Sequence, residues 1–267
     1  MHHQIDSLAY SNRLRYLPPE HKLLFAATLF CFGFAAPPVL QILITIWMAI
    51  WIVGYAQIPA SIYLKLQAIP LAFWFASLPA LVLGTVWVAH IESIRADVIW
   101  GISLGNVFLY CSRQGIQQAG FLLTRSVALT SCMYFILLTT PFAEMIRILR
   151  KIGCPGAIAE LLTLMYRFIF LLTETANQLL IAQQVRVGYG NWKTGLRSAG
   201  IVAGQLLHQT LENYRQIALG LTSRGYGGEL QVWSIRRDKP NPRYTAEAVF
   251  GCWLLFVSIG WSYVARI

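Results

Sequence analysis

Two short runs carry the residues of this 267-residue chain that are best suited to recognition chemistry. Residues 183–192 read "QQVRVGYGNW" and residues 221–230 read "LTSRGYGGEL", so each run places one arginine close to a Gly-Tyr-Gly cluster. A guanidinium group presents a planar fork that can grip a carboxylate or a phosphate through two hydrogen bonds. Arg186 and Arg224 are therefore candidates for binding an anionic group of a partner.

The first run has a superficial likeness to a nucleotide-binding loop, because "GYGNWKT" follows from Gly188. A Walker A loop needs glycine immediately before its lysine, whereas Trp192 precedes Lys193. The dinucleotide fingerprint needs glycine or alanine at its sixth position, where Lys193 stands. The sequence also contains no HExxH, no GxSxG and no paired carboxylates within an apolar segment. We therefore predict a non-catalytic protein that itself binds no ATP, no other cofactor and no metal.

The elements that position these arginines belong to a strongly apolar chain. Apolar residues make up 57% and charged residues 12%, compared with about 25% charged residues in a soluble domain. Residues 23–64 include no charged side chain over 42 positions, and residues 66–91 add 26 more. Because a bilayer core takes about 20 apolar residues per helix, the sequence predicts an all-α integral membrane protein. We expect five transmembrane helices, the first of them short, at about 22–36, 38–56, 67–90, 115–140 and 246–264.

The basic residues predict the orientation of these helices. Of the 21 lysines and arginines, 13 lie between residues 141 and 245, against six acidic residues. Positively charged loops remain on the cytoplasmic side. We therefore predict three parts: residues 1–140 with four spans and a cytoplasmic N-terminus, a cytoplasmic insert at 141–245, and a last span at 246–267. The positive charge suits contact with anionic lipid headgroups rather than with nucleic acid.

The insert has the pattern of three helices. Thr140 and Pro141 are start signals for a short basic amphipathic helix that Gly153 and Pro155 end, and longer helices are expected at about 156–186 and 194–222. Arg186 and Arg224 then lie at the C-terminal ends of the two longer helices. Helix capping alone would explain one such end, but two ends that share Arg, Gly and Tyr favour docking to a partner. In the last helix, Gly200 and Gly204 form a small-xxx-small notch that permits close approach of another helix.

The stretch at 186–230 resembles the coupling region of the transmembrane T component of energy-coupling-factor transporters, in particular the cobalt-type T subunit, CbiQ. The resemblance extends over residues 6–24, 125–155 and 166–186, and therefore covers most of the chain. The mark of this family is two short Ala-Arg-Gly-like motifs at the ends of cytoplasmic coupling helices. Here the second motif is Ser223-Arg224-Gly225, which differs in its first residue. The first is Val185-Arg186-Val187, with Gly188 one place late.

This resemblance implies an L-shaped multi-pass protein of the bacterial cytoplasmic (inner) membrane, with its coupling domain inserted before the last span. Each arginine motif would enter the groove of one of two cytoplasmic ATPase subunits. The membrane helices would hold a substrate-binding S component, possibly with a small accessory membrane subunit. The implied cargo is cobalt ion, with nickel next, and the metal site would belong to the S component. The residues implied in docking are Arg186, Val187, Gly188, Ser223, Arg224 and Gly225.

Two other functions are compatible with parts of the sequence. A permease subunit of an ordinary ABC importer contacts its ATPase through one coupling helix, and the doubled arginine motif argues against it. Recruitment of a membrane-embedded or a soluble binding protein would separate these two. A membrane enzyme would need a catalytic constellation, and only the stripe formed by Glu160, Arg167 and Glu174 could serve. Without catalysis, the stripe is explained equally well as a polar seam against a neighbouring helix or a partner subunit, or by internal ion pairing or snorkelling.

Overall fold

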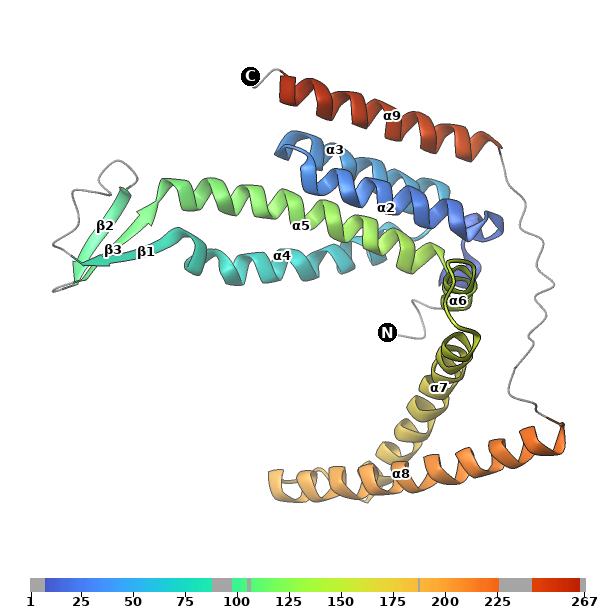
Figure 1. Ribbon diagram of the computed structural model, residues 1–267. Helices are drawn as coiled ribbons and strands as arrows, with labels where there is room; N and C mark the ends of the chain where they lie inside the picture. The colour runs from blue at the N-terminus through green and yellow to red at the C-terminus, as the bar shows by residue number, and fades with distance from the viewer. Residues whose placement is uncertain (1–7, 88–97, 105–106, 187, 226–241, 265–267) are drawn as a thin grey trace. The chain divides into compact units, whose positions relative to one another are not determined.

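The computed structural model describes residues 8–87, 98–104, 107–186, 188–225 and 242–264 (Figure 1). It divides into two compact units. Residues 1–141 and 237–267 form the first, here called the bundle unit, and residues 142–236 form the second, the insert unit. The insert unit thus interrupts the bundle unit between its fourth and fifth long helices.

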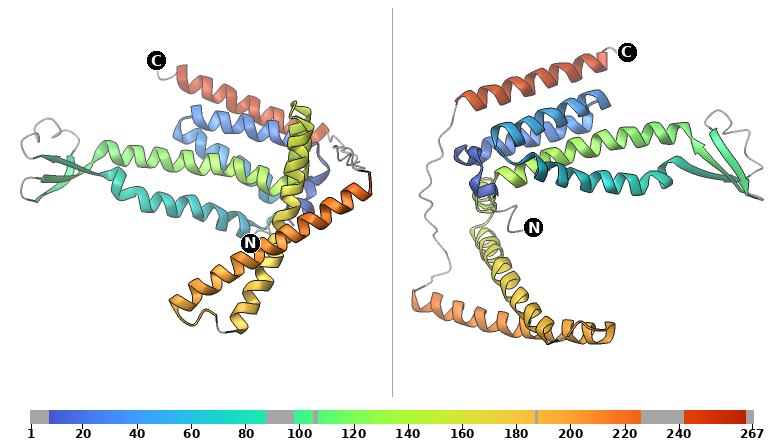
Figure 2. Two further views of the ribbon diagram at one scale, coloured as in Figure 1. Left: turned by 60° about the horizontal axis from the view of Figure 1, so that its bottom comes forward. Right: turned by 180° about the vertical axis from the view of Figure 1, so that it is seen from behind.

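Five long helices run side by side in the bundle unit (Figures 1 and 2). Proline sets several of their boundaries, because it is tolerated in the first turn of a helix but not in the interior. Pro37 and Pro38 form the tight turn expected between the first two helices, and Pro59 precedes the third. The helices are α2 (Pro19–Ala35), α3 (Pro38–Ala49) with its π-helical continuation (Ile50–Tyr55), α4 (Ala60–Val82), α5 (Arg113–Thr139) and α9 (Pro242–Val264).

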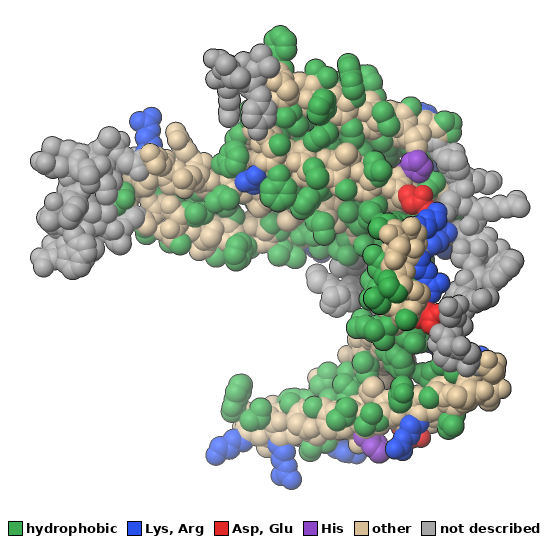
Figure 3. All heavy atoms as spheres, in the orientation of Figure 1, with side chains coloured by type: hydrophobic (Ala, Val, Ile, Leu, Met, Phe, Trp, Pro, Cys, Tyr) green, Lys and Arg blue, Asp and Glu red, His purple; other side chains and the backbone are tan. Residues whose placement is uncertain are grey.

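The membrane class is confirmed by helix length and composition. Within the described residues, four of the predicted spans correspond to helices that are long and apolar enough to cross a membrane: Pro38–Tyr55, Ala60–Val82, Arg113–Thr139 and Pro242–Trp261. Large apolar side chains cover much of the outer surface of this unit (Figure 3), with Val39, Phe73 and Trp261 each more than three-quarters exposed. Exposed apolar surface of this extent is what a lipid-facing bundle requires.

Two helices depart from the predicted set of spans. The first predicted span is α2, whose 17 residues measure about 26 Å at 1.5 Å per residue, short of a hydrocarbon core of about 30 Å. In the insert unit, α7 (Gly156–Val185) is also long and apolar enough to cross a membrane. Length and composition alone do not place α7, so its location in the cytoplasm stays a prediction.

The predicted helix at 67–90 is wrong at its C-terminal end. The helix stops at Val82, and Leu83–Trp87 forms strand β1. This strand pairs antiparallel with β3 (Val107–Ser112), which also pairs with β2 (Val98–Leu104), in the order β1-β3-β2. Pro79 disrupts the helix three residues before its end, and the following Gly-Thr-Val-Trp contains three residues that favour strands. Hydropathy does not distinguish an apolar strand from an apolar helix. The change from helix to strand at Leu83 could therefore not be predicted from the absence of charged residues.

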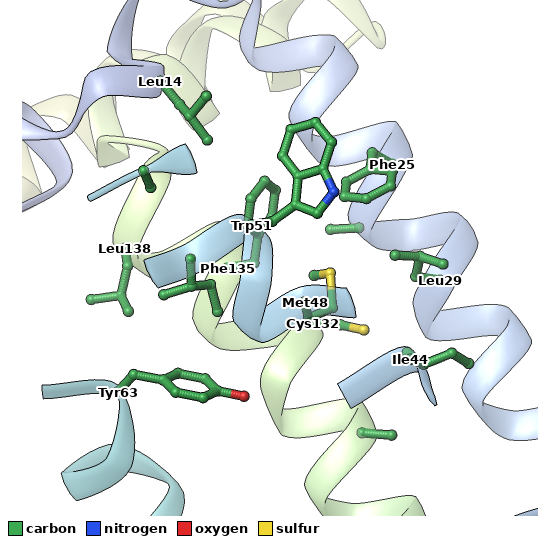
Figure 4. Packing of buried hydrophobic residues seen from close by; sticks show 14 of the residues in the cluster. Leu14, Phe25, Leu29, Ile44, Met48, Trp51, Tyr63, Cys132, Phe135 and Leu138 are labelled. Atoms are coloured by element: carbon green, nitrogen blue, oxygen red, sulfur yellow. The ribbon is translucent and has the colours of Figure 1, made fainter. Parts of the chain in front are cut away.

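The core of the bundle unit is built from aromatic and branched side chains of α2, α3, the π-helical segment and α5 (Figure 4). Phe25 packs against Trp51 with ring centroids 5.0 Å apart, and meets Phe135 edge-on at 5.8 Å. Cys132 is buried among these residues as a small apolar side chain. This cluster holds the helices through packing and not through charge.

A buried polar residue ties three of the helices together. Gln41 of α3 is completely buried. Its Nε2 donates hydrogen bonds to the carbonyl oxygens of Gly33 (3.1 Å) and Ala36 (3.0 Å), and its Oε1 accepts one from Thr124 Oγ1 (2.7 Å). The last carbonyls of a helix lack intrahelical partners, and in a bilayer no water is available to satisfy them. Gln41 therefore satisfies the end of α2 while it joins α3 to α5.

Replacing Gln41 by leucine is expected to lower the free energy of unfolding of the chain by about 1–3 kcal/mol, because the buried carbonyl oxygens of Gly33 and Ala36 lose a hydrogen-bond donor. Thermal unfolding in detergent micelles measures this effect. Gln118→Leu, on the exposed side of α5, is the matched control and should leave stability nearly unchanged. Equal effects of the two substitutions would contradict the assigned role of Gln41.

Candidate docking site at two helix ends

The insert unit consists of α6 (Phe142–Lys151), α7 (Gly156–Val185) and α8 (Trp192–Ser223). Gly153, in the left-handed region at φ +104°, and Pro155, at the N-cap of α7, separate α6 from α7 as the sequence predicts. The ring of Phe142 stacks on Tyr166 at 4.7 Å, which joins α6 to α7. The helices α7 and α8 cross each other (Figure 2).

Arg186 and Arg224 occupy equivalent positions in the two longer helices. Arg186 is the C-cap residue of α7, with φ −83° and ψ 13°, and Arg224 is the C-cap residue of α8, with φ −91° and ψ 8°. Both side chains are exposed. Within the described parts of the chain, neither guanidinium group has a hydrogen bond or an ion pair. Two arginines in the same backbone conformation are thus presented outward, each with its full set of donors.

The glycine that follows Arg186 one place late has a specific contact. The Gly188 N–H donates to the carbonyl oxygen of Gln183 at 2.9 Å, which closes the C-terminus of α7 in the manner of a Schellman motif. The Gly188 carbonyl oxygen in turn accepts a hydrogen bond from Ser198 Oγ at 2.9 Å, and Ser198 is buried in α8. A Cβ atom at Gly188 would collide with Ser198 Oγ and lie 2.9 Å from the Gln183 oxygen. Glycine at this position therefore allows the second turn of α8 to pack on the end of α7.

The glycine that follows Arg224 has a different role. Gly225 lies in the left-handed region at φ +71°, and its N–H donates to the carbonyl oxygen of Thr222 at 3.1 Å. A Cβ atom there would meet no atom of the described chain within 4 Å. Gly225 is thus the left-handed cap expected from the sequence, whereas Gly188 is needed for close approach. Val187, Tyr226, Gly227 and Gly228 lie outside the described residues.

The two arginines are widely separated. Arg186 precedes the turn into α8, whereas Arg224 follows the last residue of that helix. The 32 residues of α8 span about 48 Å at 1.5 Å per residue. The two guanidinium groups therefore cannot bind one small ligand together, and the geometry suits two separate binding sites.

The turn between α7 and α8 presents an aromatic surface that the sequence reasoning did not identify as functional. Asn191 and Thr194 form a capping box at the start of α8. A shallow hollow at this turn is lined by Tyr189, Trp192, Leu196 and neighbouring small residues, and Trp192 is 87% exposed. An aromatic residue beside a helix-capping asparagine was the available signal.

The predicted glycine notch does not hold the crossing of α7 and α8. A Cβ atom at Gly200 or Gly204 would meet no described atom within 4 Å, and both positions are exposed. The two helices meet instead where Ser198 contacts Gly188. The notch is therefore open, and its packing against a partner helix stays a prediction.

Glu160, Arg167 and Glu174, the stripe that an enzyme would have to use, lie at intervals of seven residues along α7. Glu160 is buried, whereas Arg167 and Glu174 are exposed further along α7. Among the residues that the structure places, no three His, Cys, Asp or Glu side chains come together in a way that could hold a metal ion. Lys193, Arg197, Arg215 and Arg224 are all exposed on α8 or at its end, where Figure 3 shows lysine and arginine side chains projecting from the helix. This surface offers cationic groups suited to binding an anionic partner.

A comparison with family models decides the family. Residues 10–233 match the model of the cobalt transport protein family CbiQ. The chain belongs to the CbiQ family. It is therefore a membrane protein of a cobalt transport family, and both arginine ends lie within the matched region.

Individual relatives agree with this assignment. The chain is 26% identical over 232 residues to the "Cobalt transport protein CbiQ" of Salmonella typhimurium, with 85% of this chain and 99% of that protein covered. It is 28% identical over 233 residues to the Rhodobacter capsulatus protein of the same name, with 87% and 88% covered. It is 29% identical over 227 residues to a "Putative fused cobalt transport protein CbiMQ" of Methanocorpusculum labreanum, with 85% of this chain but 37% of that protein covered.

Proposed function

We propose that this CbiQ-family chain is the energy-coupling membrane component of an ATP-driven metal-ion importer of the energy-coupling-factor type. In this proposal Arg186 and Arg224 each dock one cytoplasmic ATPase subunit, and the bundle unit holds a membrane-embedded substrate-binding component. The observation that carries the proposal is the pair of outward-facing arginines, equal in backbone conformation and about one α8 length apart.

The chemistry of the docking contact follows from the arginine side chain. A guanidinium group that enters a groove can form two parallel hydrogen bonds with a carboxylate, which fixes geometry as well as affinity. The helix C-terminus behind each arginine carries a partial negative charge that favours the cation. With one contact at each end of α8, a relative movement of the two ATPase subunits would be transmitted to both ends of this helix.

The cargo is proposed to be cobalt ion, with nickel as the second candidate. The names of the relatives support cobalt. The fused CbiMQ relative supports a second transport component beside this one, because this chain covers only 37% of the fused protein and the rest is a further part joined to it. The chain itself is proposed to bind neither the metal nor ATP. We expect the metal site on the substrate-binding component and ATP on the ATPases.

Purification of the tagged chain from its native membrane tests this function. We expect two ATPase subunits and a membrane-embedded binding component to accompany it. Recruitment of a soluble binding protein instead would favour an ordinary ABC importer and would contradict the proposal.

Reconstitution of that complex in proteoliposomes tests the cargo. We expect ATP-dependent uptake of labelled cobalt that exceeds uptake of labelled nickel at equal concentration, because the relatives are named for cobalt. Uptake of nickel alone would be compatible with the coupling role but would contradict the assignment of cobalt as the cargo.

A further inference from the structure

The C-terminal end of α5 is held by two buried polar side chains from the N-terminal segment of the chain. Asn12 Nδ2 lies 3.2 Å from the carbonyl oxygen of Leu138 and 3.4 Å from that of Thr139. Lys22 Nζ donates to the same Thr139 oxygen at 3.1 Å. Asn12 is 7% exposed, Lys22 is 4% exposed, and both acceptor residues are fully buried. These contacts join segments that are more than 100 residues apart in the sequence.

The end of α5 needs such partners. Thr140 N–H bonds back to Ile136, but the next residue is Pro141, which has no N–H to offer to Leu137 and ends the helix. The carbonyl oxygens of the last turn are therefore without intrahelical donors. Two of them, at Leu138 and Thr139, are satisfied by Asn12 and Lys22.

The end of α5, and not the helix that carries Lys22, favours a cation at this position. Lys22 lies in the first turn of α2, where the positive end of the helix dipole disfavours a cation. Burial of an ammonium group is costly unless it is hydrogen-bonded. The C-terminus of α5 supplies a carbonyl acceptor at Thr139 and the negative end of a helix dipole, so contact with this helix end favours the buried cation.

The segment that carries Asn12 is itself anchored. Leu14 and Leu17 are buried in the core cluster, and the Arg13 N–H donates to the carbonyl oxygen of Ala56 at 3.4 Å. Asn12 Nδ2 also bonds to the carbonyl oxygen of Ala9 at 2.8 Å. Because the side-chain nitrogen of Asn12 faces the carbonyl oxygens of Ala9, Leu138 and Thr139, a hydrogen-bond donor is required there.

We infer that Asn12 and Lys22 are positioning residues that clamp the end of α5, the point from which the chain leaves the bundle unit for the insert unit at Phe142. This inference rests on the proposed coupling function. One of the two covalent connections between the units runs through Thr140 and Pro141, so a force on the insert unit that follows this connection reaches the end of α5. A clamped helix end transmits that force to the bundle, whereas a free end would unwind and dissipate it.

Two substitutions test the clamp. Lys22→Met keeps the length of the side chain and removes the cation. Asn12→Asp keeps the shape and replaces the donor by an acceptor that faces carbonyl oxygens. The matched control is Lys65→Met, because Lys65 is exposed in the first two turns of α4. Each variant is made in the full chain and purified with its ATPases.

The first readout is amide hydrogen exchange over residues 136–140. We expect exchange about tenfold faster in Lys22→Met and Asn12→Asp, since a hydrogen bond to a charged or buried group is lost, and no change at residues 113–120 or in Lys65→Met. The second readout is cobalt ion taken up per ATP hydrolysed in proteoliposomes. We expect this ratio to fall several-fold in the clamp variants, at an unchanged amount of bound ATPase.

Unchanged exchange at residues 136–140 would overturn the clamp. Faster exchange with an unchanged ratio of uptake to hydrolysis would overturn its positioning role. Loss of bound ATPase in the clamp variants would also contradict the inference, because docking is assigned to other residues. Failure of the proposed function is distinguishable, since it would show as absence of ATPases from the unsubstituted complex.

Discussion

Reversal of charge at Arg224 should abolish docking of one ATPase and stop ATP-dependent metal uptake. Loss of an arginine that pairs with a buried carboxylate costs about 3–5 kcal/mol, which corresponds to binding weaker by about 10²- to 10⁴-fold. Arg224→Glu adds repulsion to this loss. Arg186→Glu is expected to have an effect of the same size, because both side chains are exposed C-cap residues in nearly the same conformation.

The binding of purified ATPase to the chain in detergent micelles or nanodiscs measures this effect. Arg215→Glu is the matched control, because Arg215 is exposed within α8 and away from either helix end. We expect the control to retain most of its affinity. Equal affinities for all three charge reversals would show that general attraction to a basic surface, and not the helix ends, recruits the ATPase.

Substitution of Gly188 by alanine should disrupt the turn that presents Arg186. The added Cβ atom would collide with Ser198 Oγ and approach the carbonyl oxygen of Gln183 to 2.9 Å. Overpacking of this kind costs about 1–3 kcal/mol, and relief of the collision must move the end of α7 away from α8. Both the thermal stability of the chain and its affinity for ATPase are expected to fall.

The contact between Gly188 and Ser198 can be isolated by a double-mutant cycle. Ser198→Gly removes the nearest colliding atoms, so Gly188→Ala in that background should cost less than in the unsubstituted chain. Gly220→Ala is the matched control, since a Cβ atom there would meet no described atom, and alanine is favoured over glycine inside a helix. Additive effects of the two substitutions would contradict the assigned contact.

The helix ends could be predicted from sequence because capping is local. An arginine followed by glycine after a long apolar periodicity indicates a C-terminus within a few residues, and α7 and α8 end next to Arg186 and Arg224 as expected. The separate roles of the two glycines could not be predicted. The need for Gly188 arises from Ser198, which lies ten residues away on another helix.

Long-range contacts and strand formation explain the remaining differences. The hydropathy of residues 83–87 predicts that they continue a transmembrane helix. They instead form a strand that pairs with β3, and hydropathy carries no information about strand pairing. The role of Lys22 could not be predicted from sequence. Its contact with Thr139 spans 117 residues, and no local pattern reveals it. The open face at Gly200 and Gly204 likewise shows that a small-residue spacing predicts close approach but not its partner.

Amide hydrogen exchange of the chain with and without bound ATPase tests most directly whether both arginine ends are docking sites. We expect protection on ATPase binding at two separate segments, residues 188–196 and residues 219–225, with the middle of α8 around residues 204–210 unchanged. Protection at only one end, or along the middle of α8 alone, would contradict the two-site account.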